Sequence, residues 1–245
     1  MMGPRQLDHA FFAYADNYLI DLKAAIIVDV EATRAIRQAE VGAARTMIER
    51  TEDCLGLCPE RLAADSAYGS AEMLGWLVNE RAIEPHIPVF DKSARDDGTF
   101  SREDFAYNQE ADLYVCPTGK ALTSTGTLVN DGATLLYRAS KYDCDACELK
   151  SRCCPKMPAR KVPRSIYENA RDVARDIAKT EAYVTSRRER KKIEMLFAHL
   201  KRILRLDRLR LRGPFGAQDE FLLAATVQNL RKLAKLIPLP GPMPA

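Results

Sequence analysis

The chain has 245 residues, 47% of them hydrophobic and 29% charged, with a formal net charge of +3 at pH 7. This composition supports one core, or one core with a small insertion, and excludes a disordered chain. The longest apolar runs, residues 24–28 and 221–227, are far shorter than the roughly 20 residues that cross a bilayer, so no membrane partner is expected. The start of the chain lacks the pattern of a secretory signal, which predicts a cytoplasmic location with reduced cysteines.

The first part of the chain predicts a pair of strands followed by a helix. Residues 10–32 alternate apolar and polar positions and are rich in β-branched and aromatic side chains. This pattern indicates an antiparallel hairpin that turns near residues 22–24. Residues 41–50 place their apolar side chains at helical intervals, so a helix is expected to cross back over the hairpin.

The next elements lead to the first candidate acid. Residues 61–64 predict a short buried strand that ends at Asp65, and the turn residues after it precede an amphipathic helix over residues 71–80. Residues 83–90 predict another strand, with two prolines that favour an edge or an irregular path. Asp65 is therefore expected at the carboxyl end of a strand.

A change in character marks residues 91–164, which hold five of the seven cysteines and few long apolar runs. We expect a small cysteine-rich insertion there. Residues 165–206 predict two helices that meet near residues 179–186. The second helix carries an apolar stripe made of Ile193, Leu196, Phe197, Leu200, Ile203 and Leu204.

The chain is expected to end in a helix and a tail. Gly213, Pro214 and Gly216 predict a break, and residues 219–237 predict a last helix. Its expected core positions are Phe221, Leu222, Ala225, Leu230, Leu233 and Leu236. The proline-rich residues 239–245 are expected to be disordered.

This order of elements predicts a three-layer α/β fold in which helices flank a sheet. The expected domains are a core built from residues 1–90 and 165–238, the insertion over residues 91–164, and the tail over residues 239–245.

Positive charge is concentrated between residues 187 and 212, which carry eleven basic and three acidic side chains. The rest of the chain is therefore net acidic. Such clustering is typical of a surface that binds a polyanion, although most charge runs are solvated helix faces. The basic residues are Arg187, Arg188, Arg190, Lys191, Lys192, Lys201, Arg202, Arg205, Arg208, Arg210 and Arg212.

Within this segment, Arg190, Glu194 and Lys201 are spaced by four and seven residues, which places them on nearly one helical face. An acid among so many cations is not needed for helix stability, because such a pair contributes only about 0.2–0.5 kcal/mol. The alternative is a simple surface ion pair.

Three segments together resemble the DDE transposases of bacterial insertion sequences. The run RERKKIEMLFAHLKRILRLDRLRLRG resembles the glutamate-bearing helix of that family, in which Arg, Glu and Lys recur with the spacing of Arg190, Glu194 and Lys201. The segment LAADSAYGS resembles the strand end with the family's second aspartate, here Asp65, and DEFLLAATVQNLRKLAKL resembles its closing helix. The resemblance covers residues 11–237.

The resemblance implies an RNase-H-like mixed sheet flanked by helices and a metal-dependent DNA strand-transfer activity. Two Mg²⁺ ions held by carboxylates, with Asp65 and Glu194 as two of the ligands, would activate the attacking oxygen and stabilise the leaving oxygen. The implied partner is transposon-end DNA near the nucleoid, with a homodimer or a full-length transposase as further partners. The residues expected to grip DNA phosphate are Arg187, Arg190, Lys191, Lys201 and Arg205.

The sequence departs from the family in its first acid, which ends a strand that precedes the hairpin. Only nine residues precede Ala10, and Asp8 follows no apolar run. Of the hairpin acids, Asp29 is the least implausible substitute. We therefore expect a truncated or degenerate copy with little strand-transfer activity. The family's tyrosine before the arginine is also absent, because residue 187 is Arg, although Tyr183 is close by.

Cysteine spacing predicts a second site. The pair Cys144 and Cys147 has the spacing that chelates one tetrahedral Zn²⁺, and Cys116 with Cys153 or Cys154 would complete four thiolates. The insertion is expected to lack a core otherwise, so that structural zinc would hold it together. The alternative is reduced, unpaired cysteine. Two further hypotheses remain: a zinc-stapled DNA-binding protein without catalysis, and a partner or inhibitor of a full-length transposase.

Overall fold

We describe a computed structural model of the chain, which covers residues 14–91, 93, 95–206 and 208–237. The chain forms two compact units, each described by itself. Unit 1 combines Met1–Ala67 with Lys179–Ala245, and unit 2 is Tyr68–Ala178. The predicted start of the hairpin at residues 10–13, the tail at 239–245, Asp8 and Asp207 lie outside the described residues. The domain boundaries drawn from the sequence stay a prediction.

A two-stranded hairpin lies at the centre of unit 1. Strand β1 (Tyr14–Asp21) pairs antiparallel with β2 (Ile26–Arg34), as predicted. The carboxylate of Asp21 closes the turn by accepting hydrogen bonds from the backbone N–H groups of Lys23 and Ala24, at 3.1 and 2.9 Å. Such a local side-chain-to-backbone bond is why Asp is favoured at turns.

Helix α1 (Arg37–Leu55) contacts the hairpin and is longer than the predicted helix at both ends. It ends at Gly56, which adopts the left-handed conformation that glycine tolerates at a helix C-terminus. Arg50 anchors the helix by binding the carboxylates of Asp29 and Glu31, at 2.8 and 2.9 Å. The contact between helix and hairpin is therefore partly ionic.

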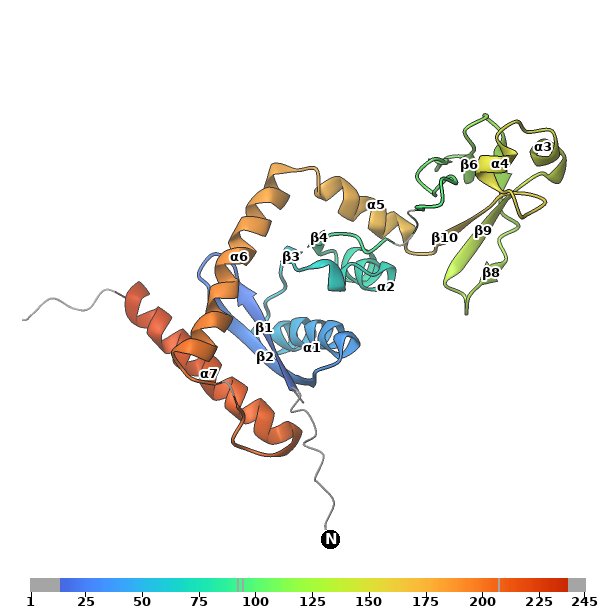
Figure 1. Cartoon of the computed structure of the whole chain (residues 1–245). Coiled ribbons are helices and arrows are strands. Elements are labelled where there is room, and N and C mark those ends of the chain that lie inside the picture. Colours follow the sequence, from blue (N-terminus) through green and yellow to red (C-terminus); the bar gives the residue numbers. More distant parts are fainter. Residues whose placement is uncertain (1–13, 92, 94, 207, 238–245) are drawn as a thin grey trace, which may run out of the picture. The chain divides into compact units, whose positions relative to one another are not determined.

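Helix α7 (Gly213–Leu236) packs on the hairpin through a small apolar core (Figure 1). Amide side chains of this helix also hydrogen-bond the outer backbone of β2. Asn229 bonds both the N–H and the C=O of Ile27, at 2.9 and 2.8 Å, and Gln218 accepts from Ala32 N–H at 2.7 Å. These bonds occupy the exposed edge of β2, which would otherwise be open to another strand. The core contains Ile27, Val30, Ala217, Phe221 and Ala225.

Two expectations for α7 were wrong. The helix begins at Gly213 and not after Gly216, because Pro214 occupies the first turn, where a missing N–H costs nothing. Of the six expected core positions, only Phe221 and Ala225 are buried. The other four, Leu222, Leu230, Leu233 and Leu236, are exposed because the hairpin covers only one side of the helix.

Helix α6 (Glu181–Arg202) begins at Thr180, whose hydroxyl accepts a hydrogen bond from Tyr183 N–H at 3.2 Å. It follows α5 (Glu168–Ile177) almost directly, so the two helices meet at the start of the predicted region of residues 179–186. Phe197 of α6 stacks on Tyr18 of β1, with ring centroids 5.1 Å apart. The predicted stripe is buried at Ile193 and Leu200 and half-buried at Leu196, Phe197 and Leu204, whereas Ile203 is exposed.

The remaining strand of unit 1 is β3 (Arg61–Ala63), which contacts α6. The turn Ser66–Tyr68 follows it. In unit 2, α2 (Ala71–Gly75) starts at Ser70, continues as the π-helical turn Trp76–Glu80, and packs on α5. Trp76 is buried.

Strand β4 (Glu84–His86) is shorter than the predicted residues 83–90. Pro85 and Pro88 lack backbone N–H groups, which limits regular pairing along this segment.

The rest of unit 2 is an antiparallel sheet with small helices above it (Figure 1). Its strands run in the order β5-β6-β7-β9-β10, and β8 also pairs with β9. The strands are β5 (Ala106–Asn108), β6 (Leu113–Val115), β7 (Ala121–Thr123), β8 (Leu128–Val129), β9 (Thr134–Ala139) and β10 (Lys161–Ser165), and the helices are α3 (Lys141–Asp145) and α4 (Lys150–Cys153).

This sheet corrects the expectation that the insertion has no core. A buried cluster fills it, with Tyr114 and Tyr137 in edge-on contact at 5.2 Å between ring centroids. The sequence did not indicate this core, because strands of three residues are too short to give a clear period-two pattern. The members are Phe105, Tyr114, Leu122, Tyr137 and Val162.

The chain is thus a mixed α/β protein, as expected from the sequence. Within the part of the chain that the structure describes, no helix is both long and apolar enough to cross a bilayer.

Candidate nucleic-acid interface and catalytic acids

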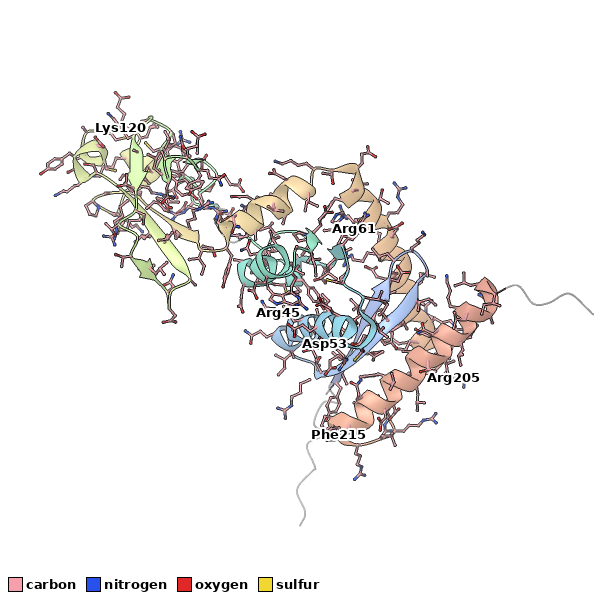
Figure 2. The ribbon with its side chains drawn as sticks, turned by 180° about the vertical axis from the view of Figure 1, so that it is seen from behind. Arg45, Asp53, Arg61, Lys120, Arg205 and Phe215 are labelled. Atoms are coloured by element: carbon pink, nitrogen blue, oxygen red, sulfur yellow. The ribbon has the colours of Figure 1, made fainter. Side chains whose placement is uncertain are left out.

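The basic surface of unit 1 follows α6 and the loop after it. Arg187, Lys191 and Lys201 are exposed on α6. Arg205, labelled in Figure 2, is exposed in the loop that leads to α7. Arg205 has a φ of 54°, a left-handed conformation in which the chain turns away from the helix axis. The predicted cluster of cations is therefore on the surface, where it can meet a polyanion.

Arg190 and Glu194 form an i,i+4 ion pair on this helix, with Arg190 Nη2 3.9 Å from Glu194 Oε1. The Glu194 side chain is 63% exposed. At such a separation and exposure the pair contributes little to stability. Glu194 therefore remains accessible to a cation or to a solvent-borne ligand.

Asp65 lies two residues beyond the end of β3, close to the predicted strand end, and it is exposed. Its Oδ1 accepts a hydrogen bond from Ala67 N–H at 2.8 Å, which holds the carboxylate in the turn after the strand. Helix α6, which carries Glu194, contacts β3, and Asp65 follows that strand by two residues.

Asp29, the hairpin acid considered as a stand-in, is held by Arg50 between the hairpin and α1. This geometry gives it a structural role. Across residues 14–91, 93, 95–206 and 208–237, no three His, Cys, Asp or Glu side chains lie close enough together to hold a metal ion. The acids in the described residues therefore do not form a complete metal site.

Asp16 is an unusual acid of the hairpin, in which Asp29 was the favoured substitute on sequence grounds. Both of its carboxylate oxygens are buried without a hydrogen-bond partner among the described residues. Burial raises the pKa of Asp16 to about 7, and the nearby Tyr18 hydroxyl offsets only part of this rise. Perturbed acids of this kind often mark functional sites. Its strand position gave one signal, because Asp lies between Tyr14 and Tyr18 on the period-two face of β1.

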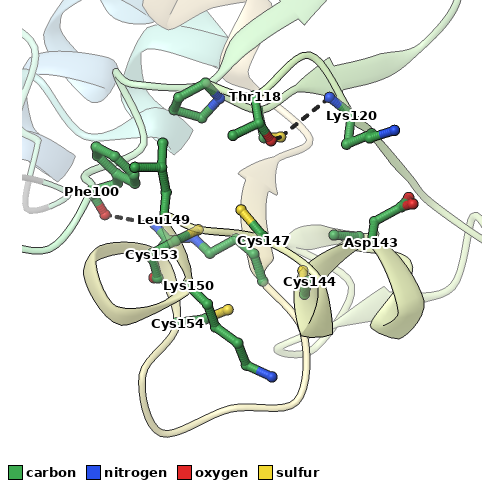
Figure 3. Close-up of a pocket in the computed structure, with 14 residues that line it drawn as sticks. Phe100, Thr118, Lys120, Asp143, Cys144, Cys147, Leu149, Lys150, Cys153 and Cys154 are labelled. Carbon is green, nitrogen blue, oxygen red and sulfur yellow. Dashed lines mark hydrogen bonds between the residues drawn. The ribbon is translucent and has the colours of Figure 1, made fainter.

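Five cysteines of unit 2 line one small cavity (Figure 3). The cavity encloses about 20 Å³, enough for one water-sized species. The Cys116 sulfur accepts a hydrogen bond from Lys120 N–H at 3.3 Å. Burial, reinforced by Cys154, raises the pKa of Cys153 to about 11. The structure thus brings together the four predicted ligands Cys116, Cys144, Cys147 and Cys153, together with Cys154.

A buried ionic cluster in unit 2 was not anticipated from the sequence. Glu168 is almost fully buried and accepts charge-assisted hydrogen bonds from arginines on both carboxylate oxygens. Asp91 Oδ2 binds the same arginines. Burial alone would raise the pKa of both acids, but neighbouring hydrogen bonds and arginine charges outweigh it and lower both. The arginines are Arg102, Arg171 and Arg175, with N···O distances of 2.7–3.0 Å.

The fold and these sites describe a mixed α/β protein with a strongly basic helix that carries Glu194 and with an exposed Asp65 after strand β3. A family model described as a transposase DDE domain matches residues 115–234, just under half of the chain. No curated protein and no solved structure gives a significant match. Residues 115–234 are therefore similar to the DDE domain of transposases, and the α/β architecture of the chain is consistent with the RNase-H-like fold of that class.

The matched segment contains most of the thiol cavity and all of α5 and α6 and ends near the end of α7, whereas Asp65 lies outside it. Transposases of the DDE class act on DNA and generally use a divalent metal such as Mg²⁺. DNA is therefore the implied substrate of this chain.

Proposed function

We propose that unit 1 binds transposon-end DNA through α6 and the loop after it. The observation that carries this proposal is the exposure of Arg187, Lys191, Lys201 and Arg205 on one helical segment within the matched transposase domain. Each cation that meets a backbone phosphate releases condensed counterions, so the binding should be strongly salt-dependent. Arg190 would contact phosphate beside Glu194.

The DNA-binding proposal is tested with two double variants that remove the same charge. The variant R187Q/K191Q removes two cations of α6, and K23Q/R34Q removes two exposed cations of the hairpin. We expect the α6 variant to lower the slope of log K against log salt by about 2, and the hairpin variant to leave it unchanged. Equal slopes in both variants, measured by fluorescence anisotropy with duplex DNA, would contradict the proposal.

We further propose that Asp65 and Glu194 are two of the acids that hold the Mg²⁺ ions during DNA cleavage and strand transfer. The contact between α6 and β3 supports this pairing. Carboxylates suit the task because Mg²⁺ prefers hard oxygen ligands. We expect calorimetry to detect weak Mn²⁺ binding by the wild-type protein and a lower Mn²⁺ affinity in E194Q. The control E189Q, which removes a neighbouring acid of the same helix, should keep the wild-type affinity. Equal binding by both variants would remove Glu194 from the site.

A further acid must complete such a site, and the hairpin indicates where it would enter. Amide side chains of α7 occupy the outer edge of β2, whereas β1 has no strand on its other edge among the described residues. A strand supplied from outside the described residues would pair there. We therefore propose that the described residues of this insertion-sequence transposase have little strand-transfer activity unless a further acid is supplied. Robust Mg²⁺-dependent nicking of its own transposon ends would refute this.

The thiol cavity supports a second proposal, structural Zn²⁺ in unit 2. Its thiols are the soft ligands that zinc prefers, and the N–H bond to the Cys116 sulfur suits a thiolate. In the present arrangement the described side chains do not converge at metal distance, so binding requires them to draw together. Purified protein should retain about one zinc per chain and lose it in C144S but not in C54S, an exposed cysteine of α1. Metal-free protein with all thiols reactive would end the proposal.

The same data distinguish the two alternative roles. A DNA-binding protein held together by zinc, without catalytic activity, would bind transposon ends and would not cleave them whichever divalent metal is added. A partner or inhibitor would co-purify with a full-length transposase and lower its cleavage rate. A homodimer would sediment at twice the mass of the chain.

A further inference from the structure

Unit 2 contains a cationic cavity of its own, whereas the basic helix α6 belongs to unit 1. It encloses about 570 Å³ and is lined by five cationic side chains and two carboxylates, together with the hydroxyls of four Ser and Thr residues. The two carboxylates, Asp91 and Glu168, are already bound by Arg102, Arg171 and Arg175. The cations left for a ligand are therefore Arg95, Arg160 and Lys161.

Arg160 is the central residue of this group. It is 93% buried, since only 7% of its surface is exposed, and it has no carboxylate within ion-pair distance among the described residues. Its Nη1 and Nη2 donate to the carbonyls of Cys153 and Phe100, at 2.8 and 2.9 Å, while its Nε has no partner. A buried guanidinium with an unused donor is costly unless an anion compensates it.

Arg95 and Lys161 add positive charge to the cavity that Arg160 lines. Both line the 570 Å³ cavity and a neighbouring cavity of about 210 Å³, which Lys156 also lines. Arg160 lines both of these cavities as well, so the three cations share one region of the surface. Arg95 also donates to Thr99 at 3.0 Å and has Asp97 nearby, so it is only partly compensated. Like charges gathered in one hollow create a local field that attracts anions.

We propose that Arg95, Arg160 and Lys161 form a phosphate-binding site that holds a backbone phosphate of DNA. A guanidinium fork and an ammonium are the side chains that bind phosphate oxygens best. DNA is the source of the phosphate because the chain is a transposase; this inference rests on the proposed function and adds a second DNA contact, on unit 2.

The test uses the full chain and two exposed residues of the site, so that loss of folding does not obscure the result. The variant R95Q/K161Q removes two cations of the cavity, and K120Q/K141Q removes two exposed cations from elsewhere in unit 2 (Figure 2 labels Lys120). At 100 mM salt, R95Q/K161Q should weaken duplex binding about tenfold and lower the salt slope by about 2. The control should change neither. R160K, checked for folding by circular dichroism, should weaken binding in the same direction.

Three outcomes separate the possibilities. If wild-type protein fails to bind duplex DNA at all, the proposed function itself falls. If wild-type protein binds and both double variants match it, DNA binding stands and the cavity site is overturned. If inorganic phosphate or a nucleoside triphosphate saturates the cavity in calorimetry while R95Q/K161Q leaves duplex affinity unchanged, the site serves a small phosphorylated ligand and the DNA assignment is overturned.

Discussion

Asp16 shows how one side chain can carry an energetic cost inside a small core. It lies on the same strand as Tyr18, which stacks on Phe197 of α6, and both of its oxygens are buried without partners among the described residues. Burial in that position destabilises the charged form of the Asp16 carboxyl group. The fold tolerates this because the acid can keep its proton until near neutral pH.

We predict that D16N changes the pH dependence of stability. The pKa in the folded chain is about 7, above the ordinary value of 3.8, so the native state binds more protons between these values. The free energy of unfolding of wild-type protein therefore falls as pH rises through this window, by on the order of a few kcal/mol. In D16N this fall should vanish, and at pH 8 the variant should be the more stable protein in urea unfolding. D53N, an exposed acid of α1 (Figure 2), serves as control and should retain the wild-type slope.

The acids of the ionic cluster should behave in the opposite sense. The pKa values of Asp91 and Glu168 are lowered, so their contribution to stability is present above pH 4 to 5 and is lost as pH falls below it. E168Q removes one charge and leaves buried arginines unpaired, which should cost about 3–5 kcal/mol at pH 7. E103Q, at an exposed position of the same unit, should cost almost nothing. A small loss in E168Q would show that water already screens the cluster.

At the scale of elements, local sequence rules located most helices and strands but misplaced their buried faces. The hairpin, α1, β3, α5 and α6 follow from period-two and helical spacing. The error at α7 arose because a leucine-rich helix has several candidate apolar faces, and only the hairpin selects the one with Ala217 and Phe221. Exposed leucines on the other face are left uncovered in the described residues.

Two glycines in helices of unit 1 test that packing. In α7, a Cβ at Gly216 would lie 2.7 Å from Leu211 Cβ, whereas a Cβ at Gly42 in α1 would meet nothing within 4 Å. We expect G216A to destabilise the chain by about 1–3 kcal/mol through overpacking. G42A should instead stabilise it by up to about 1 kcal/mol, because alanine is the better helix former. Equal effects of the two substitutions in chemical denaturation would contradict the close contact between α7 and Leu211.

At the scale of the whole molecule, the division into two compact units predicts two unfolding transitions. Trp76, the single tryptophan, is buried in unit 2, so its fluorescence reports that unit alone. We expect E168Q to shift the fluorescence transition, and D16N to shift only the far-UV dichroism of the long helices in unit 1. One coincident transition in both variants would show that the units unfold as a single cooperative body.

The sequence by itself determined the features that depend on neighbours along the chain. These are the hairpin, the basic helix with Arg190, Glu194 and Lys201 on one face, and the cysteine spacing of the insertion. It also carried the likeness to the DDE transposases. The spacing of side chains along a helix or strand is a local property, so it can be predicted from the sequence of that segment alone.

The tertiary structure alone decided which side chains are buried and which meet across long stretches of sequence. It placed Asp16 in a dry position and gave the cysteine-rich insertion a core of its own. It also gathered Arg95 and Arg160 in one cavity, although 64 residues separate them in the chain. The burial of a side chain and the meeting of side chains from distant segments depend on tertiary contacts. The periodicity of one segment does not predict those contacts.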